Sequence, residues 1–477
     1  MKERPVLVWF RQDLRLRDHP ALSAAAAGGR PVIPAYVHSP EEEGEWALGG
    51  ASRWWLHHSL AGLDLELRSR GLRLLIRRGT AAECLRELAA ESGAEALFFS
   101  RRWEPAAGLQ EEAVSEKLKA LGLAVQAFDG TLLFAPSSVQ RAAGGPYQVF
   151  TPFWRACLQL ADPDPVLPAP EMLRGPRRWP GSLPLEALQL LPQPDWTGGL
   201  PAAWQPGEAG AQRRLMAFVT EGLVGYEVGR DALGQEGISR LSPHLHFGEL
   251  SPRQVWQAVD GLPGGKAYLR QLGWREFAHH LLHHFPHTPT RPLRPEYAVF
   301  PWLEDAPALR AWQQGQTGYP LVDAGMRQLW QSGWMHNRAR LVAASFLVKH
   351  LLTPWQEGAR WFWDTLVDAD LANNTLGWQW TAGCGADAAP YFRIFNPARQ
   401  GARFDPQGKY VRRWVPELER LPDAWVHRPS EAPDVVLAAA GMVLGRTYPF
   451  PVVDHAMARQ RALAALAEMR KRFRAGC

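Results

Sequence analysis

A proline-dense stretch in the middle of the chain constrains the fold more than any other feature. Residues 131–206 contain fourteen prolines, which are spread over the whole stretch. Proline lacks an amide hydrogen and fixes φ, so these residues cannot form a long helix or a central strand. The stretch is not rich in glycine and serine, as a flexible linker would be, so we expect it to dock on its neighbours. It predicts a connector between an N-terminal domain (residues 1–130) and a C-terminal domain (residues 207–477).

Before this connector, short apolar runs alternate with amphipathic segments. The runs predict strands at residues 6–10, 32–37, 72–76, 96–99 and 123–128, and the segments predict helices at residues 53–70, 80–92 and 110–121. Thr80 followed by Glu83 is a capping-box pattern, which predicts that the Thr80 side chain caps the second helix. Strands that alternate with helices form parallel sheets covered on both faces. The N-terminal domain is therefore predicted to be α/β, with a Rossmann-like parallel sheet.

After the connector, apolar residues recur with helical spacing. This periodicity predicts helices at residues 213–223, 252–259, 267–284, 307–314, 321–331, 337–349, 354–366 and 455–473. The last helix is predicted to be amphipathic and basic on its polar face. The C-terminal domain is therefore predicted to be all-α.

Composition narrows the class of protein. The 477 residues are 46% hydrophobic, yet no apolar run is long enough to span a bilayer. No signal-peptide pattern is present, so we expect a cytoplasmic protein without membrane contact. Cys84, Cys157, Cys384 and Cys477 are too widely spaced to indicate a zinc ribbon or a disulfide framework. The net charge of +5 permits a polyanionic partner.

The histidine-rich segment 279–284 places His279 over His283 and His280 over His284 on a predicted helix. Such pairs can bind zinc, but the segment has neither a third ligand nor a catalytic glutamate. Packing and surface roles are favoured, and no metal site is predicted. Phosphate-binding glycine loops and a nucleophile elbow are also absent from the sequence.

Two stretches are dense in residues that carry chemistry. Residues 333–340, 368–374 and 377–380 combine paired arginines and aspartates with amides and tryptophans, a set that could hold a planar, phosphorylated cofactor. Residues 391–420 contain seven basic and three acidic residues with interleaved aromatics, which suits a phosphate backbone and stacked bases. Helix capping in the first stretch and a solvated face in the second remain the alternatives.

Long motifs resemble those of the photolyase/cryptochrome family over nearly the whole chain. They occupy residues 6–22, 239–254, 273–277, 317–329, 333–340 and 387–401. The segment at residues 41–56 resembles the bacterial class III enzymes, which are related to plant cryptochromes and act on cyclobutane pyrimidine dimers. The family fold consists of an α/β domain, a long connector and a helical FAD domain, in agreement with the segmentation above.

The resemblance implies that FAD is held in a bent shape by the helical domain. Arg340 and Asp368 are expected to form an ion pair beside the flavin ring, Asp370 to lie near the ribityl chain or ring edge, and Asn374 to face N5. The remaining cofactor-binding positions implied are Tyr226, Ser239, Arg240, Leu241, Ser242, Tyr268 and Arg275.

The resemblance also implies an electron relay of three tryptophans. Trp378 would lie next to the flavin, Trp355 would follow, and Trp302 would lie towards solvent. A single tryptophan is more often core filler, but here all three positions match.

The activity implied is light-driven repair of cyclobutane pyrimidine dimers by an electron from excited, reduced FAD. The dimer would leave the base stack of UV-damaged DNA to reach the flavin. Trp274 and Trp380 are expected to wall its pocket and Asn337 to line it. The flanking phosphates or bases would be gripped by Arg230, Arg338, Arg393 and Gln400. The protein is expected to act as a monomer and to associate with the nucleoid when bound to DNA.

Two pocket positions depart from the family pattern. Gln271 stands where a glutamate is usual. Compared with glutamate, its side chain has no negative charge and no proton to supply. Leu341 stands where a methionine is usual, and it lacks the polarizable sulfur. Weakened repair is therefore expected. The histidine pair of (6-4) photolyases is incomplete, because Arg340 follows His336 at the second position. A cryptochrome-type blue-light photoreceptor remains the alternative.

Three alternatives exist for an antenna chromophore in the N-terminal domain. The positions that hold a folate in class I enzymes read Leu48, Ala106 and Ala107. A folate such as MTHF bound differently, a deazaflavin, or no antenna are the alternatives.

Overall fold

The protein is described here by a computed structural model that covers residues 4–160, 163–388 and 392–475. The chain forms two compact units, each built from separate segments. The first comprises Met1–Val224, Ser239–Pro286 and Val367–Leu371, and the second comprises Gly225–Ile238, His287–Leu366 and Ala372–Cys477. The predicted domain boundaries at residues 131 and 207 divide the chain into three successive stretches, whereas each unit combines segments that are distant in the sequence. These boundaries therefore stay a prediction.

A five-stranded parallel sheet forms the centre of the first unit. Its strands are β1 (Val6–Phe10), β2 (Val32–His38), β3 (Leu75–Arg78), β4 (Ala96–Ser100) and β5 (Ala124–Phe128), in the spatial order β3-β2-β1-β4-β5. The predicted α/β class is confirmed. Strand β3 begins three residues later than predicted, because the Leu72 amide donates to the Leu67 carbonyl and closes the preceding helix.

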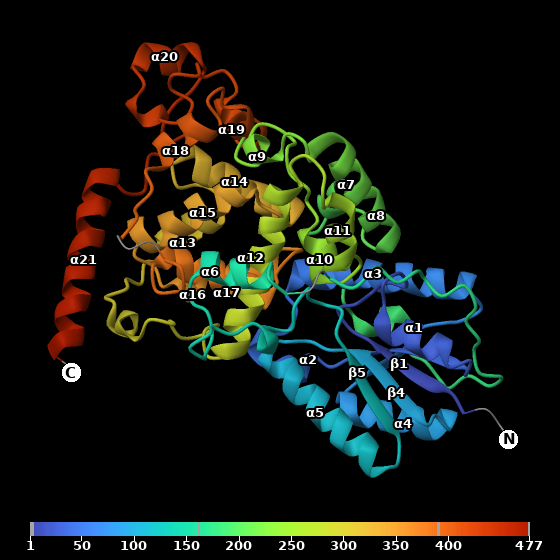
Figure 1. Cartoon of the computed structure of the whole chain (residues 1–477). Helices are drawn as coiled ribbons and strands as arrows, with labels where there is room; N and C mark the ends of the chain where they lie inside the picture. The colour runs from blue at the N-terminus through green and yellow to red at the C-terminus, as the bar shows by residue number, and fades with distance from the viewer. Residues whose placement is uncertain (1–3, 161–162, 389–391, 476–477) are drawn as a thin grey trace. The chain divides into compact units, whose positions relative to one another are not determined.

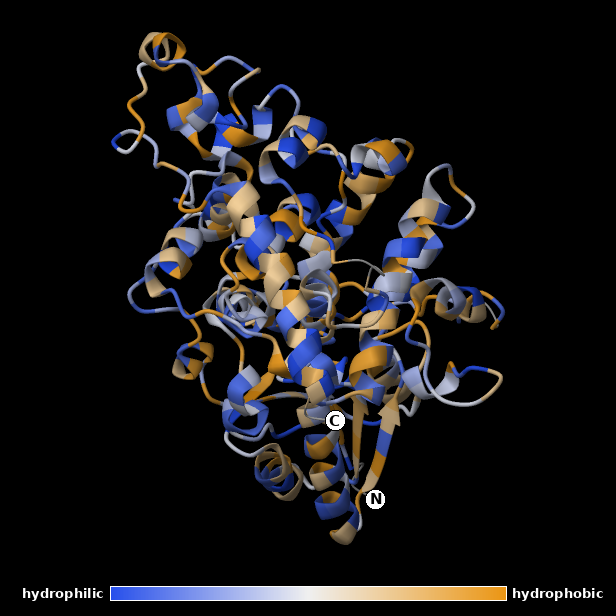
Figure 2. Cartoon of the chain, turned by 90° about the vertical axis from the view of Figure 1, so that its left-hand side faces the viewer, coloured by the Kyte–Doolittle hydropathy of each residue, from blue (hydrophilic) through white to orange (hydrophobic). Residues whose placement is uncertain are grey.

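Helices cover both faces of this sheet, as Figure 1 shows. Right-handed crossovers place α1 (Pro20–Ala27) and α3 (Gly50–Ser69) on one face, and α4 (Ala81–Ser92) and α5 (Pro105–Ala120) on the other. Strands β1 and β2 are buried along their whole length, so they are continuous apolar runs rather than alternating ones. Figure 2 shows such strands in the colour of hydrophobic residues.

The predicted capping box at the start of α4 is wrong. Thr80 occupies the N-cap position, but its side chain makes no capping hydrogen bond. The first amide of the helix, that of Ala81, donates instead to Glu42 Oε2 at 2.8 Å. Glu83 pairs with Arg86 and Lys117, so it cannot return to the N-cap backbone. A carboxylate distant in sequence has therefore replaced the local cap.

The proline-dense connector is docked on the first unit, as expected. It contains one two-turn helix, α6 (Phe150–Cys157), and short turns that include α7 (Leu200–Ala203). The Leu183 amide donates to the Ile76 carbonyl of edge strand β3 at 3.0 Å, and Trp179 packs against the sheet core. The connector therefore covers a strand edge that would otherwise expose unpaired backbone groups.

Four helices complete the first unit: α8 (Glu208–Ala217), α10 (Ser242–His246), α11 (Pro252–Val259) and α12 (Gly265–His284). The Trp55 indole donates to Glu249 Oε1 at 2.9 Å, and Arg15 donates to the Gly248 carbonyl at 2.8 Å. The His280 and His284 rings both contact the Pro136 carbonyl oxygen, which gives this pair a packing role. No metal-binding cluster of His, Cys, Asp or Glu occurs among the described residues.

The second unit is helical. It contains α9 (Tyr226–Gly229), α13 (Ala306–Gln313), α14 (Pro320–Ser332), α15 (Asn337–Ser345), α16 (Trp355–Thr365), most of α17 (Leu371–Ala382), α18 (Pro397–Phe404), α19 (Lys409–Trp414), α20 (Asp434–Ala439) and α21 (His455–Ala475). The predicted helices at residues 213–223 and 337–349 each end in a π turn, at Phe218–Gly222 and Phe346–His350. Hydrophilic residues recur along α21, as predicted (Figure 2).

Two further properties bear on the class of protein. Within the described ranges, no helix combines the length and the apolar character needed to cross a bilayer. Cys84, Cys157 and Cys384 are buried free thiols. Cys477, and Tyr391 at the start of the predicted basic stretch, lie outside the described residues.

Candidate functional site

In the first unit, several predicted cofactor-binding residues form one hydrogen-bonded group. The Tyr268 hydroxyl donates to Ser239 Oγ at 2.8 Å, and the Leu241 amide approaches the same oxygen at 3.4 Å. Arg214 Nε donates to the Ser239 carbonyl at 2.8 Å. The hydroxyl of Ser239 is thereby held in place just before helix α10.

Backbone conformation sharpens the turn at this point. Arg240 has φ of 52°, in the left-handed region that a side chain rarely adopts, and Ser242 begins α10 as an exposed residue. Such strain in a non-glycine residue is found most often at ligand sites. The described hydrogen bonds of Arg275 do not involve the Ser239 group. Its Nη1 donates to the Thr131 carbonyl at 3.1 Å and approaches Glu276.

Asp370 lies at the centre of a buried histidine pair in the same unit. Its Oδ2 is 3.3 Å from His279 Nε2 and 3.8 Å from His246 Nδ1. Burial by itself would raise the pKa of Asp370, but the facing histidines outweigh it and hold that pKa well below the usual range. The backbone carbonyl of Asp368, which is also buried, accepts from the Asp370 amide at 2.8 Å. Asp370 is therefore a preformed anionic group.

In the second unit, Trp378 is enclosed by aromatic rings. Its ring centroid is 5.0 Å from that of Phe362 and 6.2 Å from that of Trp312. Gly358 on α16 faces the same indole so closely that a Cβ there would lie 2.0 Å from Trp378 Cη2. The position of this indole therefore depends on a glycine in the neighbouring helix.

The other two predicted relay tryptophans differ in exposure. Trp355 begins α16 and is 2% exposed, as is Trp378, whereas Trp302 is half-buried and contacts Phe300 with ring centroids 4.3 Å apart. Asn374 Nδ2 donates to the Ala359 carbonyl at 3.1 Å, which fixes the orientation of its amide.

The predicted phosphate-binding arginines of the second unit share one carboxylate. Arg338 makes a bidentate pair with Asp231, with Nε and Nη2 at 2.7 and 2.6 Å from the two oxygens. Arg230 Nε lies 3.8 Å from Asp231, and its guanidinium lies over the Tyr226 ring at 5.7 Å. Arg340 Nε donates to the Met335 carbonyl at 2.7 Å. Asp231 therefore positions two arginines at once.

The predicted pocket residues lie as follows. Trp274 on α12 stacks on Phe150 of the connector, with ring centroids 3.9 Å apart, and Arg270 lies over that Phe150 ring. Trp380 donates to the Asp387 carbonyl, and the exposed Arg393 lies 5.9 Å from its ring. The remaining positions are Gln271, whose amide approaches the Ala267 carbonyl, exposed Asn337, and half-buried Leu341 and Gln400.

Three groups were missed by sequence reasoning. Asp231 follows Arg230 directly, so an adjacent opposite charge was the available signal. Gly358 interrupts a helical pattern, and a glycine at such a place indicates close packing. His246 and His279 gave no signal, because their common partner is distant in the sequence.

The residues present fit a flavin dinucleotide. In the first unit, one ring nitrogen of each histidine faces Asp370, whereas the other two, His246 Nε2 and His279 Nδ1, are buried without a hydrogen-bond partner. In the second unit, the buried Trp378 Nε1 likewise has none. Buried polar atoms are normally satisfied, so these fit a polar ligand edge. The Ser239 hydroxyl and Arg240 provide a phosphate-type donor set.

The comparisons with known proteins agree with this geometry. A family model described as DNA photolyase matches residues 6–171, and one described as the FAD binding domain of DNA photolyase matches residues 268–468. The chain is 49% identical to a deoxyribodipyrimidine photo-lyase of Agrobacterium fabrum, over 99% of each chain. It is 41% identical to Cryptochrome-1 of Arabidopsis thaliana, over 97% of this chain and 70% of that protein.

Solved structures extend the likeness to three dimensions. The crystal structure of a bacterial class III photolyase from Agrobacterium tumefaciens superposes with a TM-score of 0.95 at 48% identity, covering 99% of this chain and 98% of that one. A cryptochrome from Synechocystis superposes with a TM-score of 0.89 at 30% identity, covering 98% and 100%.

Proposed function

This chain belongs to the photolyase/cryptochrome family, and we propose that it is an FAD-dependent lyase that repairs cyclobutane pyrimidine dimers in DNA under light. The observation that carries the proposal is the match along 99% of the chain to a protein named deoxyribodipyrimidine photo-lyase. The named photo-lyase is also more similar to this chain than Cryptochrome-1 is.

The chain's own residues have three tasks in this reaction. When bound and reduced, FAD supplies a light-driven electron that splits the cyclobutane ring and is afterwards recovered. Ser239, Arg240 and Tyr268 would hold its phosphates and ribose, and Asp370 would present a fixed negative charge to its ribityl chain or ring edge. The aromatic rings around Trp378 keep water from its indole, which would lie next to the flavin.

Trp378, Trp355 and Trp302 would reload the cofactor with electrons. Two are buried and the third is half-buried, so the series runs from the interior towards solvent. Indole is easily oxidised, and several short transfers are faster than a single long one. Trp378→Phe is expected to slow flavin photoreduction at least tenfold.

Neighbouring positions provide matched controls for this relay. Trp312→Phe should change photoreduction little, since the Trp312 indole is a packing group that donates to the Ala343 carbonyl. Gly358→Ala should slow photoreduction because the added methyl collides with Trp378, whereas Gly377→Ala meets nothing within 4 Å. If the two alanine substitutions slow photoreduction equally, Trp378 is not part of the relay.

DNA contacts complete the proposal. Arg338, oriented by Asp231, and the exposed Arg393 would bind phosphates beside the lesion. The dimer would be flipped out of the duplex onto Trp274 and Trp380, since a damaged base pair unstacks at low cost. The protein would act as a monomer in the cytoplasm, on the nucleoid.

A blue-light receptor is the second candidate, and Gln271 favours it. The family's dimer-repair enzymes carry a carboxylate there that stabilises the dimer, and this chain has a neutral amide. The 41% identity to Cryptochrome-1 is consistent with this candidate.

A repair assay separates the two functions. Photoreduced holoprotein is mixed with an oligonucleotide that carries one thymine dimer, and recovery of base absorbance is followed in light and in darkness. We expect recovery only in light, and faster recovery for Gln271→Glu. A photoreducible holoprotein that leaves the dimer intact, and changes its oligomeric state in light, would establish the receptor instead.

A further inference from the structure

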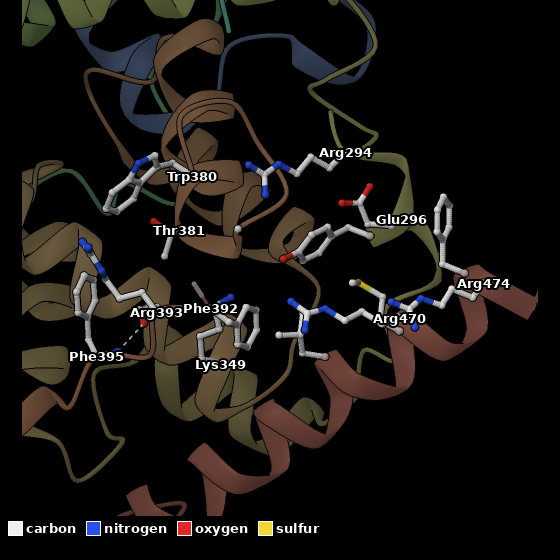
Figure 3. A pocket seen from close by; sticks show the side chains of 16 residues that line it. Arg294, Glu296, Lys349, Trp380, Thr381, Phe392, Arg393, Phe395, Arg470 and Arg474 are labelled. Atoms are coloured by element: carbon white, nitrogen blue, oxygen red, sulfur yellow. Dashed lines mark hydrogen bonds between the residues drawn. The ribbon is translucent and has the colours of Figure 1, made fainter. Parts of the chain in front are cut away.

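A cavity of about 370 Å³ lies wholly within the second unit. Its lining does not include Trp378 or the aromatic rings that enclose Trp378. Arg294 and Tyr297 line it from the turn at Pro295–Val299, Lys349 from the π turn after α15, and Arg470 from α21. Figure 3 shows the side chains of Arg294, Lys349 and Arg470 converging on one space. Cavities of this size hold small molecules or single residues of a polymer.

The charge of the lining is strongly one-sided. Four arginines, Arg294, Arg393, Arg470 and Arg474, and the amine of Lys349 face the cavity, against the single carboxylate of Glu296. A concave surface of one sign with apolar walls focuses its field on the interior. The lining therefore selects an anionic ligand.

Lys349 is the most deeply placed of these side chains. Its side chain is 1% exposed, Nζ donates to the Ala382 carbonyl at 2.6 Å, and it lies 3.2 Å from the Phe392 ring centroid. Burial lowers the pKa of this amine well below its usual value, with the Cys384 thiol as the nearest acidic group. An anion in the cavity would supply the missing counter-charge and favour the ammonium form.

Aromatic rings form the rest of the lining. Trp380, Phe392 and Tyr297 line the same space as the arginines. Burial raises the pKa of Tyr297 to about 12, so its hydroxyl remains a hydrogen-bond donor at neutral pH. Arginines combined with flat rings are the recognition chemistry of single-stranded nucleic acid.

We propose that this cavity is a subsite for one unpaired nucleotide of the DNA strand, distinct from the dimer, with its phosphate on Arg470 and Arg474 and its base against Phe392 and Tyr297. The inference rests on the proposed function. It extends that function because Trp380 and Arg393, both expected to contact damaged DNA, line the same cavity. A free nucleotide has the same chemistry, and the test separates the two sources.

The test measures binding of a fluorescent single-stranded oligothymidylate to the flavin-loaded, full-length protein at several salt concentrations. Arg470→Gln with Arg474→Gln should weaken binding about tenfold and reduce the slope of log K against log salt by about 0.7 to 1.4, the value for one or two lost phosphate contacts. Both arginines are exposed, so folding should be unaffected.

The matched control removes two charges from the same helix outside the cavity. Arg459→Gln with Lys471→Gln should bind the oligonucleotide with nearly wild-type affinity and salt slope, since both side chains are exposed and neither lines the cavity. Equal losses in the two double variants would overturn the subsite. Phe392→Leu should cost roughly 5- to 150-fold, the range for one stacked base. Full affinity in that variant would also overturn it.

Two further arms identify the source and separate the hypotheses. Thymidine 5′-monophosphate alone should compete weakly with the oligonucleotide. The DNA subsite would be refuted if the monophosphate binds tightly and oligonucleotide affinity is the same with and without the Arg470 and Arg474 substitutions. The cavity would then be assigned to a free nucleotide. If the wild type repairs no dimer in light yet the arginine-specific loss persists, the proposed function fails and the subsite stands.

Discussion

Two buried aspartates, one in each unit, are stabilised in opposite ways. Asp323 in the second unit accepts four hydrogen bonds from neutral donors: the Thr317 amide and hydroxyl, the Gly318 amide and the Tyr448 hydroxyl, at 2.5 to 3.1 Å. Asp370 in the first unit faces two histidines at 3.3 and 3.8 Å. Burial raises the pKa of Asp323, whereas the histidines hold the pKa of Asp370 well below its usual range despite burial.

The difference separates a structural carboxylate from a functional one. Neutral donors satisfy all the acceptor positions of Asp323 and tie α14 to residues 317 and 448, leaving nothing for a ligand. Histidines keep Asp370 ionised, while His246 Nε2 and His279 Nδ1, the ring nitrogens that do not face it, remain without hydrogen-bond partners. A buried charge whose pKa is strongly perturbed by such neighbours is typical of a functional site.

The largest expected effect is on stability, at Asp323. Asp323→Ala would leave four buried donors without an acceptor and should reduce the free energy of unfolding by about 3–5 kcal/mol. Urea unfolding of the apoprotein, followed by tryptophan fluorescence, measures it. The exposed Asp434→Ala on α20 is the control and should change stability by less than about 0.5 kcal/mol. Similar losses at both positions would contradict the structural role of Asp323.

A smaller loss is expected from a single donor to this carboxylate. Tyr448→Phe removes the hydroxyl 2.5 Å from Asp323 Oδ2 and should cost about 1.5–3 kcal/mol, the range for a bond to a charged acceptor. Tyr319→Phe removes a hydroxyl that donates to the neutral Val453 carbonyl at 2.7 Å, and should cost about 0.5–1.5 kcal/mol. The reverse order in thermal unfolding would show that charge on Asp323 is unimportant.

Flavin retention is the expected effect at Asp370. Asp370→Asn keeps the shape and a hydrogen-bonding group but removes the charge, so flavin affinity should fall about tenfold, or about 1.4 kcal/mol. Stability of the apoprotein should also fall, since the depressed pKa of Asp370 corresponds to a stabilising contribution from its charge. Equilibrium dialysis and apoprotein unfolding measure the two quantities. Unchanged flavin affinity together with a large stability loss would make Asp370 a second structural carboxylate.

The smallest expected effect is a difference in pH dependence. The depressed pKa of Asp370 means that its contribution to stability is present above the unfolded pKa, about 3.9, and is lost as pH falls further. The raised pKa of Asp323 gives the opposite sign: its contribution is present below that unfolded value and declines as pH rises through the folded pKa.

Comparing unfolding of the wild type with Asp370→Asn and with Asp323→Asn between pH 4 and 7 tests this pair. The wild-type advantage over Asp323→Asn should shrink as pH rises from 4, whereas the advantage over Asp370→Asn should stay level and shrink only towards the acid end. Parallel profiles for the two variants would contradict the assignment.

Local patterns were sufficient for most of the fold. Strands β1, β2, β4 and β5 and helix α11 lie where apolar period and turn residues predict them, because their signals depend on neighbouring residues. Helices α19 and α20 have six residues each, so they carry too few turns for a period to show. The Thr80 cap failed because Glu42 supplies the acceptor from a distant part of the chain.

The candidate site shows the same limit. The motif residues follow from the family resemblance, but their partners do not. Asp231 and Arg338 are 107 residues apart, and His246, His279 and Asp370 come from three different helices or turns. Only the packed structure shows that Gly358 fixes Trp378. Pairings of this kind are set by tertiary packing, for which a single sequence has no local signal.

The segmented construction of the first unit has a consequence for synthesis. Its last segment, Val367–Leu371, leaves the ribosome only after the 80 intervening residues His287–Leu366 of the other unit. At about 5–20 residues per second, His279 waits roughly 5 to 18 s and His246 roughly 6 to 25 s for the carboxylate that they face. During that interval the parallel sheet can form, but the buried histidines have no anion. The nascent chain therefore cannot complete its cofactor-binding half by folding from the N-terminus alone.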